Sequence, residues 1–539
     1  MTRTAPALRA DLLIVGGGLG GVAAALAALT RGHSVIITEE TDWLGGQLTT
    51  QATPPDEHPW IEQFGSTASY RRLRNGIRQY YRDWYPLTDV ARSDPQLNPG
   101  LGRVSKLCHE PRVAVAVIDG MLAPWLATGR LTVLREVEPV HADVVAGCIT
   151  AVTLSGRDGT ERSVSGEYVL DATELGDLLP LTGTDYVTGF ESRAETGEPS
   201  APDDAQPDNI QAFSWVFAIA NDEGQDHTIV KPASYDHWST QRPDYWPGPM
   251  VGLTAPDPRT LEPLVREFTP NAVAVPGVVP DQSKDPGDRE LWEFRRILAR
   301  ASFEPGFIDS DVTVVNWPMI DYVAGSIIDV SAEEKQRHLA GARELSMAMF
   351  YWLQTEAPRP DGGAGWPGLH LRGDVLGTDD GFSKAPYIRE SRRIRALRTV
   401  VEQDVSLLVR GDRGAAVYDD TVGIGMYRID LHPSTGGDNY IDVPSTPFQI
   451  PLGALIPRDA TNLLAAGKNA GTTHITNGCF RLHPVEWNIG EAAGALASYC
   501  IALGTNPAAV HADERLLSDF QNSLVRDGFE LAWPEIKGY

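Results

Sequence analysis

The pattern of apolar and polar positions predicts a βαβ unit at the start of the chain. Residues 12–15 form a short apolar run typical of a buried strand, and residues 34–38 form a second. The alanine-rich segment between them, ending near Thr30, is typical of a helix. Five of the six residues 16–21 are glycine, which favours a tight turn and argues against one membrane-spanning helix over residues 12–29.

Periodic apolar positions predict three helices farther along the chain. They cover residues 70–85, residues 387–405, and a long segment that opens with the capping pair Ser331 and Glu334. The first of these helices carries several arginines, which either grip an anion or lie on a solvated face with their stems along the surface. These arginines are Arg71, Arg72, Arg74 and Arg78.

The back of the chain repeats the order of strand and helix. A strand is expected over residues 462–466, followed by a loop with His474, Arg481 and His483, and a helix from about Asn488. A further strand is expected to end at Asp171-Ala172-Thr173. These pieces could complete a sheet with the βαβ unit, and the N-terminus of such a helix can stabilise negative charge on a flavin ring.

The glycine turn carries the first chemical signal. Gly16, Gly18 and Gly21 match G-x-G-x-x-G, in which glycine permits the tight turn, close approach of the backbone to a pyrophosphate, and close packing of helix on strand. The helix N-terminus then faces the phosphates. Glu39, at the end of the second strand, can accept hydrogen bonds from an adenosine ribose. The alternative is an alanine-rich core helix after a flexible turn.

Composition and charge narrow the partners. Acidic residues outnumber basic ones by 72 to 46, giving a formal charge of −26, which argues against nucleic acid or an anionic membrane surface as a partner. Four scattered cysteines include no C-x-x-C pair, so we predict neither a disulfide scaffold nor a metal site. The sequence start lacks the pattern of a signal peptide, and we expect a cytoplasmic protein.

Several segments together resemble the FAD-dependent oxidoreductase family, which has a single Rossmann-type FAD domain of the glutathione-reductase-like superfamily. They include "WLGGQLTTQ", "DATELGDLLPL", "NWPMIDY", "YIRESRRI", "MYRIDLHP", "IPLGALIP" and "LLAAGKNAGTTHITNGCFRLHP", and they cover nearly the whole chain. A more distant similarity links His474 and Arg481 to fumarate reductase flavoproteins. Glu174 departs from the pattern, because glycine is usual at that position.

This resemblance implies FAD as the cofactor. The absence of a second G-x-G-x-x-G in a strand-to-helix context argues against a two-dinucleotide reductase. Candidate cofactor-binding residues are Gly16, Gly18, Gly20, Gly21, Glu39, Glu40, Gly45, Gly46, Gln47, Gln51, Asp171, Ala172, Thr173, Gly467, Asn469, Asn488 and Ile489.

Candidate catalytic residues lie near the back of the chain. By the resemblance, Arg481 is a clamp for a substrate anion and His474 is its polar partner. A guanidinium fork can fix a carboxylate or carbonyl, and a histidine can take up the proton when an alcohol or amine is oxidised. His432, His474 and His483 are the candidates for this base. For each of them, the alternative is a hydrogen-bonded structural residue.

We therefore predict an α/β protein with a discontinuous Rossmann-like FAD-binding domain and an inserted α+β substrate domain. Its expected activity is hydride removal from a small organic substrate to FAD, with oxygen or an electron carrier reoxidising the flavin. The alternatives are a flavin monooxygenase using NAD(P)H, and a non-redox enzyme or binding protein with structural FAD. The expected domains are 9–50, 110–182 and 445–505 for FAD, 51–109 as a mostly helical insertion, 183–444 for substrate, and 506–539 as a C-terminal tail.

Overall fold

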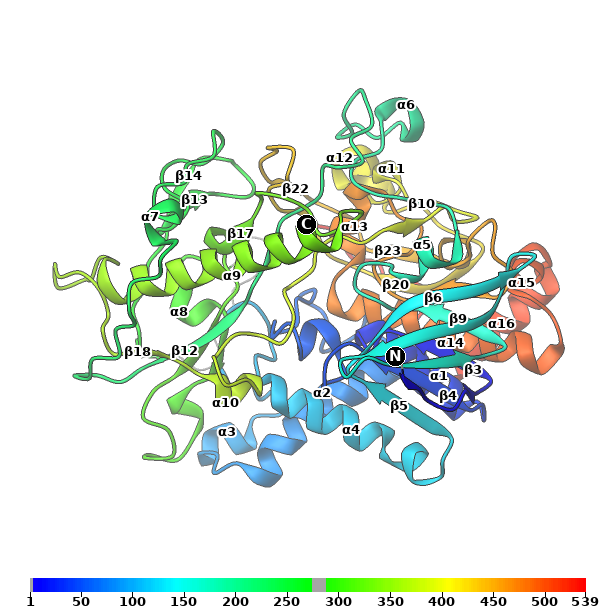
Figure 1. Ribbon diagram of the computed structural model, residues 1–539, viewed down its shortest axis with the longest axis horizontal. Coiled ribbons are helices and arrows are strands. Elements are labelled where there is room, and N and C mark those ends of the chain that lie inside the picture. The colour runs from blue at the N-terminus through cyan, green and yellow to red at the C-terminus, as the bar shows by residue number, and fades with distance from the viewer. Residues whose placement is uncertain (1–2, 274–286) are drawn as a thin grey trace.

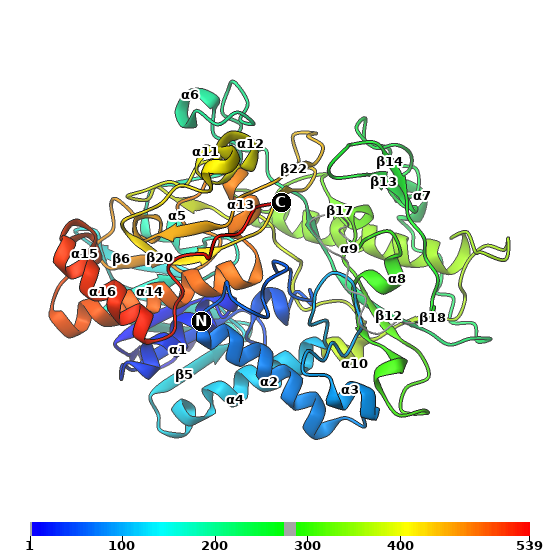
Figure 2. The same cartoon turned by 180° about the vertical axis from the view of Figure 1, so that it is seen from behind.

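The computed structural model describes residues 3–273 and 287–539. Its ribbon divides into two lobes, one built from the first and last parts of the chain and the other mainly from its middle (Figures 1 and 2). Residues 274–286, which belong to the expected substrate domain, lie outside the described part.

A five-stranded parallel sheet forms the centre of the first lobe. Its strands follow the order β24, β9, β3, β4, β5. The predicted βαβ unit and the α/β class are confirmed, and segments from the front, the region near residue 170 and the back of the chain share one sheet. The strand bounds are β3 Leu12–Val15, β4 Val35–Glu39, β5 Leu131–Arg135, β9 Tyr168–Asp171 and β24 Leu463–Ala465.

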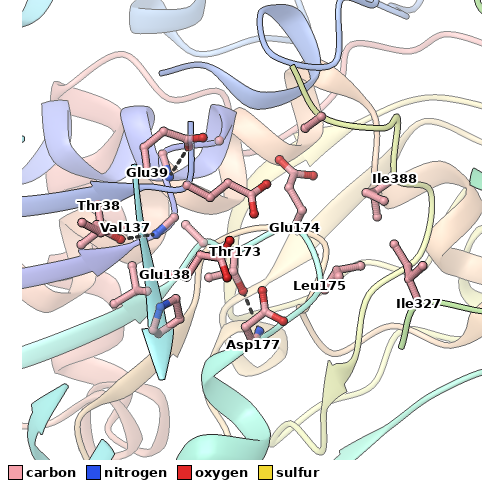
Figure 3. A pocket seen from close by; sticks show the side chains of 18 of the residues that line it. Thr38, Glu39, Val137, Glu138, Thr173, Glu174, Leu175, Asp177, Ile327 and Ile388 are labelled. Carbon is pink, nitrogen blue, oxygen red and sulfur yellow. Dashed lines mark hydrogen bonds between the residues drawn. The ribbon is translucent and has the colours of Figure 1, made fainter. Parts of the chain in front are cut away.

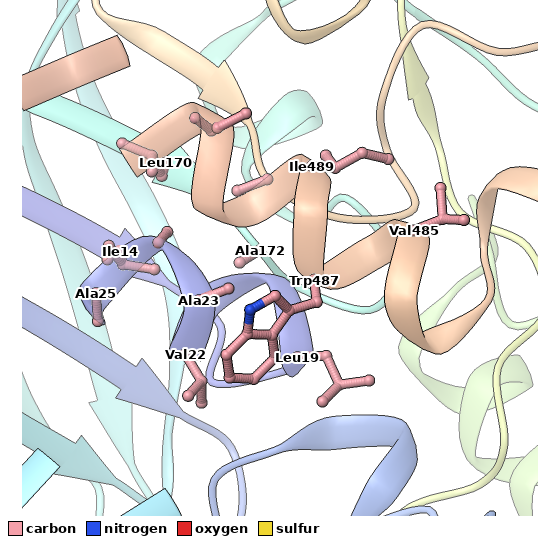
Figure 4. Packing of buried hydrophobic residues seen from close by; sticks show 14 of the residues in the cluster. Ile14, Leu19, Val22, Ala23, Ala25, Leu170, Ala172, Val485, Trp487 and Ile489 are labelled. Atoms are coloured by element: carbon pink, nitrogen blue, oxygen red, sulfur yellow. The ribbon is translucent and has the colours of Figure 1, made fainter. Parts of the chain in front are cut away.

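Two helices pack closely beside this sheet, α1 (Leu19–Thr30) and α14 (His483–Leu503). A Cβ atom on Gly490 would lie 2.0 Å from the carbonyl oxygen of Gly20, so only glycine allows the two backbones to approach this closely. Trp487, on α14, lies over the first turns of α1 and fills the remaining space (Figure 4). The glycine and alanine content of both segments therefore serves packing as well as the turn.

A second sheet lies next to the first lobe's core and contains an antiparallel meander. Its path runs β1, β8, β7, β6, and β2 also pairs with β8. The bounds are β1 Arg3–Thr4, β2 Leu8–Arg9, β6 Val137–Val145, β7 Cys148–Gly156 and β8 Thr160–Ser165.

The second lobe has its own core beneath a long helix, α9 (Ala332–Thr355). Ser331 and Glu334 form the predicted capping box at its start. A four-stranded antiparallel sheet in the order β15, β16, β12, β18 completes the lobe, with bounds β12 Phe217–Asn221, β15 Arg296–Leu298, β16 Val312–Val315 and β18 Leu369–Leu371.

The arginine-rich helix is α2 (Ala68–Trp84); Arg72 is exposed, as expected of a solvated face, whereas Arg74 and Arg78 fit neither expectation. Arg74 and Arg78 are buried, where they grip protein carboxylates rather than a ligand. Arg74 Nε lies 2.8 Å from Glu57 Oε1, and Arg78 Nη2 lies 2.6 Å from Glu62 Oε1. Because each buried guanidinium has an acidic partner, these side chains fix the segment before the helix.

Residues 387–405 do not form the predicted helix. They are mostly extended, with a short strand β19 (Arg393–Ile394) and one helical turn α11 (Glu402–Val405). Three arginines in this segment have partners in different directions, since Arg389 pairs with Asp321, Arg392 with Asp329, and Arg393 with Glu191. Tertiary ion pairs thus override the local helical pattern.

The back of the chain also differs from expectation. The stretch expected to be a loop contains helix α13 (His474–Phe480), and α14 begins at His483 rather than near Asn488. Pro484 lies in the first turn of α14, where a missing N–H costs no helical hydrogen bond. Among the described residues, no helix is both long and apolar enough to cross a bilayer.

Other helices and strands of the described chain are α4 Pro111–Ala127, α5 Leu178–Thr182, β11 Phe213–Ser214, β17 Asp321–Tyr322, β20 Thr421–Gly425, β21 Ile429–Leu431, β22 Ile441–Val443, β23 Phe448–Pro451, α15 Pro507–Ala512 and α16 Glu514–Arg526.

Candidate functional site

A cavity of about 310 Å³ opens at the carboxyl ends of β3, β4 and β9, and we call it the sheet cavity (Figure 3). Ligands of open α/β sheets bind at this edge. Its lining comprises residues 15–18, 38–40, 137–139 and 172–175, together with Gln51, Asp177, Pro180, Leu181, Ile327, Lys335, Leu339, Ala385, Pro386 and Ile388.

The glycine turn lines this cavity with bare backbone. Gly16 has a φ of 103°, a conformation that favours glycine. A Cβ on Gly17 would lie 2.7 Å from Glu39 Oε2, and one on Gly18 would lie 2.9 Å from Glu174 Oε1. The cavity therefore exists because these positions carry no side chain, as a cofactor that approaches the backbone requires.

Glu39 is held rigidly at the end of β4. Its carboxylate accepts hydrogen bonds from Gly17 N at 3.2 Å and from both the backbone N and the hydroxyl of Thr41. Burial raises the pKa of Glu39 to about 7, against the lowering effect of these hydrogen bonds. A ribose hydroxyl donating to this carboxylate would favour its ionised form.

Two buried polar atoms on the cavity lining have no hydrogen-bond partner among the described residues, Gln51 Nε2 and Glu174 Oε1. Buried polar groups are normally satisfied, so orphaned atoms facing a cavity suit a polar ligand such as FAD. Lys468 pairs with both Glu174 and Glu486, the latter at 3.3 Å. This ammonium compensates part of the charge that Glu174 brings to a position where glycine is usual.

The turn after β9 is organised by Asp171, which lies behind the cavity wall. Asp171 Oδ1 accepts from Thr173 N at 3.0 Å and from its hydroxyl at 2.7 Å, and Oδ2 accepts from Leu178 N. Burial raises the pKa of Asp171 to about 7. Ala172 and Thr173 themselves line the cavity.

The other candidate cofactor residues surround the sheet cavity at different depths. Gly45 N donates to Gly17 O at 2.7 Å, which sets the second glycine pair beside the first. Gln47 Nε2 donates to Arg481 O at 2.8 Å, and Asn469 Nδ2 donates to Asp171 O at 3.0 Å. Glu40 and Gln51 line the cavity, and Gly46 adjoins Gly18. Gly467 N donates to the Asn469 side chain. Gly20 and Gly21 instead allow close packing of the backbone.

Asn488 and Ile489 lie within α14 rather than at its start. Asn488 Nδ2 donates to Val422 O at 3.3 Å, and Ile489 belongs to the apolar core around α1 (Figure 4). The described lining of the sheet cavity includes neither residue. The reason is the earlier start of the helix, which moves both side chains more than one turn away from its N-terminus.

A second cavity, of about 130 Å³, is rich in arginine, and we call it the arginine cavity. Its cationic lining consists of Arg259, Arg266, Arg295, Arg389, Arg428 and Arg481, with His432 beside them. Its other polar residues are four aspartates, four tyrosines and one asparagine, namely Asp56, Asp288, Asp430, Asp442, Tyr387, Tyr427, Tyr440, Tyr539 and Asn316.

One extended segment, residues 385–389, lies between the two cavities. Ala385, Pro386 and Ile388 line the sheet cavity, whereas Tyr387 and Arg389 line the arginine cavity. Successive side chains of an extended chain point to opposite sides, so residues 386–389 of this segment alternate between the two cavities. It is held by hydrogen bonds between Tyr387 and Ser214 of β11.

Hydrogen bonds connect the two sides of this segment. Arg481 Nη1 donates to Tyr387 Oη at 3.2 Å, and Tyr387 Oη donates to Gln47 Oε1 at 3.1 Å. Burial raises the pKa of Tyr387, although the neighbouring Arg481 opposes this, so the phenol stays protonated and can donate. Arg481 Nη2 also donates to Asp430, while the buried Arg481 Nε has no hydrogen-bond partner among the described residues.

His432 lines the arginine cavity and is oriented by a carboxylate. Its Nδ1 lies 2.5 Å from Asp321 Oδ2, and its Nε2 lies 3.8 Å from Asp430 Oδ2. Burial would raise the pKa of Asp321, but Arg389 and His432 hold it below its usual range. Asp321 is therefore an acceptor, which assigns the imidazole proton to Nδ1 and leaves the lone pair on Nε2.

The other two candidate histidines lie deeper in the protein. His474 stacks on Phe190 with ring centroids 3.6 Å apart, and its Nδ1 lies 2.9 Å from Glu390 Oε1. His483 Nδ1 accepts from Asp56 N at 3.0 Å, and burial lowers the pKa of His483 to about 3. The described linings of both cavities include neither histidine.

The sequence did not single out Tyr387, Arg295 and Arg389, although all three line the arginine cavity. Tyr387 and Arg389 belong to the segment interpreted as a helix, which hid the alternation that places them on one face. Arg295 lies about 190 residues before Arg481 and carries no local motif. Only the tertiary fold brings it to the site.

Comparison with known proteins adds the family. A family model described as FAD dependent oxidoreductase matches residues 11–524. The FAD-dependent monooxygenase atnJ of Arthrinium sp is 44% identical over 54 residues, which are 10% of this chain and 13% of that relative. The chain thus matches only about an eighth of this relative's length.

Solved structures give weaker likenesses. A glycerol-3-phosphate dehydrogenase from Bacillus halodurans, complexed with FAD, has 15% identity over 40% of each chain and a TM-score of 0.24. A flavocytochrome c3 fumarate reductase in an open conformation has 16% identity, covers 31% of this chain and 34% of its own, and gives a TM-score of 0.20.

Proposed function

Because this chain belongs to the FAD dependent oxidoreductase family, we propose that it removes a hydride from a small organic anion held in the arginine cavity. FAD, when bound, supplies the acceptor for that hydride. The observation that carries the proposal is the segment 385–389, which presents Tyr387 and Arg389 to one cavity and Pro386 and Ile388 to the other.

FAD would be held in the sheet cavity by groups this chain already positions. The backbone of residues 16–18 would meet the pyrophosphate at the start of α1, where the first N–H groups have no partner within the helix. Glu39 would accept from the adenosine ribose. Gln51 Nε2 and Glu174 Oε1 are the unpaired polar atoms available to the rest of the cofactor.

Arg481 orients the substrate in this proposal. It is 2% exposed, keeps an unpaired Nε, and touches both Tyr387 and Asp430. Arg295 adds a second cation whose carboxylate partner, Asp56, is 3.5 Å away, so its charge is less fully compensated than that of Arg481. A carboxylate or other anionic group would gain two charge-assisted contacts between these side chains.

His432 receives the proton that leaves the substrate. Asp321 holds its Nδ1, so the Nε2 lone pair is available at the cavity. Asp321 remains ionised beside Arg389 and stabilises the imidazolium that forms. Tyr387 donates a hydrogen bond and excludes water, because its side chain is buried between the cavities.

The test is anaerobic mixing of the FAD-loaded protein with small carboxylic acids, amino acids, hydroxy acids, alcohols and sugars, with flavin absorbance as the readout. We expect bleaching by an anionic member of the panel and, with Arg481→Ala, a fall in the bleaching rate while bound FAD is retained. Arg300→Ala, at a partly exposed arginine distant from both linings, is the matched control. Equal rates for wild type and Arg481→Ala would contradict the proposal.

A flavin monooxygenase is a second candidate, supported by the name of the relative matched over 54 residues. This candidate requires NAD(P)H to reduce the flavin before oxygen reacts. Its test is NAD(P)H consumption in air with and without candidate substrates. Consumption coupled to insertion of oxygen into a substrate would favour it over hydride removal.

A further inference from the structure

Three potential metal ligands meet in the second lobe, and none of them lines either cavity. They are Asp222, His227 and His370, and one ligand atom from each lies within 4.8 Å of the others. Asp222 Oδ2 is 3.0 Å from His227 Nε2 and 3.5 Å from His370 Nδ1. We call this group the His-Asp cluster. Two imidazoles thus converge on a single carboxylate oxygen.

The backbone fixes this arrangement. Strands β12 and β18 lie side by side in both views, and Asn221 pairs with Leu369 at their shared end (Figures 1 and 2). Asp222 N then donates to Gly368 O at 2.9 Å, and His227 N donates to Pro367 O at 2.7 Å. All three ligands are therefore attached to one strand end rather than to independent loops.

The loop between the first two ligands is held from a third direction. Gln354, near the end of α9, donates from Nε2 to His227 O at 2.8 Å, and its Oε1 accepts from Ile229 N at 3.0 Å. Gln354 is 2% exposed, so this anchor is part of the core. Sites held by buried second contacts bind metals with less ordering cost than sites on free loops.

The hydrogen bonding of the cluster is incomplete as it stands. His370 Nδ1 is buried and has no hydrogen-bond partner among the described residues, although the carboxylate lies 3.5 Å away. A cation bound to both His370 Nδ1 and the Asp222 carboxylate would satisfy the two groups. Glu223 and Asp226, exposed in the same loop, add negative charge that attracts a cation.

We propose that the His-Asp cluster binds one Zn²⁺ ion. Two imidazoles and a carboxylate, with water in the fourth position, form a donor set common for zinc, whereas Mg²⁺ and Ca²⁺ prefer oxygen ligands alone. The ion would fasten the loop of residues 222–229 to β18. The sequence spacing did not predict this site, because His370 joins the other two ligands only through the β12–β18 pairing.

This site is separate from the proposed chemistry. Leu339 of α9 lines the sheet cavity and Gln354 contacts the cluster, and these 15 residues of helix span about 22 Å. An ion at this distance from the sheet cavity would not contact the cofactor, and none of its three ligands lines the arginine cavity. Metal binding is therefore expected to leave the rate of flavin bleaching unchanged.

The test is isothermal titration calorimetry of the FAD-loaded, chelator-treated protein with ZnCl₂. We expect one saturable site in the wild type, and His227→Ala and His370→Ala should each weaken it at least about tenfold, since even partners that only orient a ligand lower metal affinity about 10–100-fold when removed. His141→Ala is the matched control, because His141 forms a single surface pair with Asp143 at 3.3 Å. Its titration should match the wild type.

Three outcomes would overturn the assignment. Zinc binding that is unchanged in both His227→Ala and His370→Ala would place the ion elsewhere, and the absence of a saturable site in the wild type would show that no zinc is bound. Displacement of Zn²⁺ by an equal concentration of Mg²⁺ would show that carboxylates alone are involved. His227 is exposed, so His227→Ala keeps the test valid if His370→Ala fails to retain FAD.

Discussion

The two cavities differ in the charge of the side chains that line them. The sheet cavity has five acidic side chains on its lining, Glu39, Glu40, Glu138, Glu174 and Asp177, against the single lysine Lys335. The arginine cavity has six arginines against four aspartates. A dinucleotide site can dispense with lysine and arginine because backbone N–H groups and a helix N-terminus bind phosphate. The second cavity offers mainly side-chain groups for recognition, so it needs guanidinium groups to hold an anion.

The largest effect is expected at the start of α1, where Gly20 packs against the backbone of Ala466 beside the sheet cavity. Gly20→Val should abolish FAD binding and lower the yield of folded protein, because even a Cβ would lie 1.8 Å from Ala466 O. Flavin absorbance of the purified protein measures this. Gly120→Ala, in α4 with open space around its Cβ position, is the control and should retain FAD with equal or greater stability.

The second-largest effect distinguishes His432, which lines the arginine cavity, from His474, which lies deeper in the protein. His432→Gln should lower the anaerobic rate constant of flavin reduction by about 10²–10⁴, the contribution of a positioned general base. His474→Gln, in a residue that pairs with Glu390, should change stability but leave that rate constant within about twofold. The reverse ranking would assign the proton transfer to His474 and would contradict the separation of the cavities described above.

A pH effect on stability is expected at the sheet cavity. Burial raises the pKa of Glu39 from 4.5 to about 7, so the folded apoprotein binds more protons than the unfolded chain between these values. The stability that Glu39 contributes is fully present below pH about 4.5 and is lost as pH rises through about 7. This difference between the two pKa values of Glu39 corresponds to at most about 3 kcal/mol in the free energy of unfolding.

Glu39→Gln stays neutral across this range, so its free energy of unfolding relative to wild type should rise between pH 5 and pH 7.5. Urea unfolding of the two apoproteins at both pH values measures the difference. Glu223→Gln, at an exposed position, should show no such change. A difference that stays flat or falls with pH would show that Glu39 is already ionised in the folded apoprotein.

The smallest effect concerns the contact between the cavities. Tyr387→Phe removes the hydroxyl that joins Arg481 to Gln47 but keeps the ring. Loss of hydrogen bonds of this kind costs about 1 kcal/mol, so the rate constant of flavin reduction should fall by up to about tenfold. Bound FAD should be unchanged. Unaltered kinetics would mean that Arg481 keeps its orientation through Asp430 alone.

The same contrast explains what the sequence could predict. Strand β3, helix α1 and Glu39 follow one another within 30 residues, and their local pattern was sufficient to predict the βαβ unit. The arginine cavity draws on residues from Asp56 to Tyr539, so only tertiary folding assembles it. Arg389 and Tyr387 were misread because "YIRESRRI" has helical spacing, while ion pairs to Asp321, Asp329 and Glu191 hold the chain extended.

Residues 474–483 show both what the sequence could predict and what it could not. The sequence predicted a loop bearing His474, Arg481 and His483, whereas the structure places them in or between helices α13 and α14, and all three are buried. It could not rank them, because their difference lies in partners far away in sequence. Arg481 meets Tyr387 and Asp430 at the arginine cavity, whereas His474 meets Phe190 and Glu390 in the core.

The most direct test of the central claim is a crystal structure of the FAD-loaded protein with an anionic substrate identified by the bleaching screen, trapped in the His432→Gln variant. We predict FAD in the sheet cavity with its adenosine ribose on Glu39, and the substrate anion on Arg481 in the arginine cavity. A substrate bound elsewhere, with Arg481 still engaged only by Tyr387 and Asp430, would contradict the account.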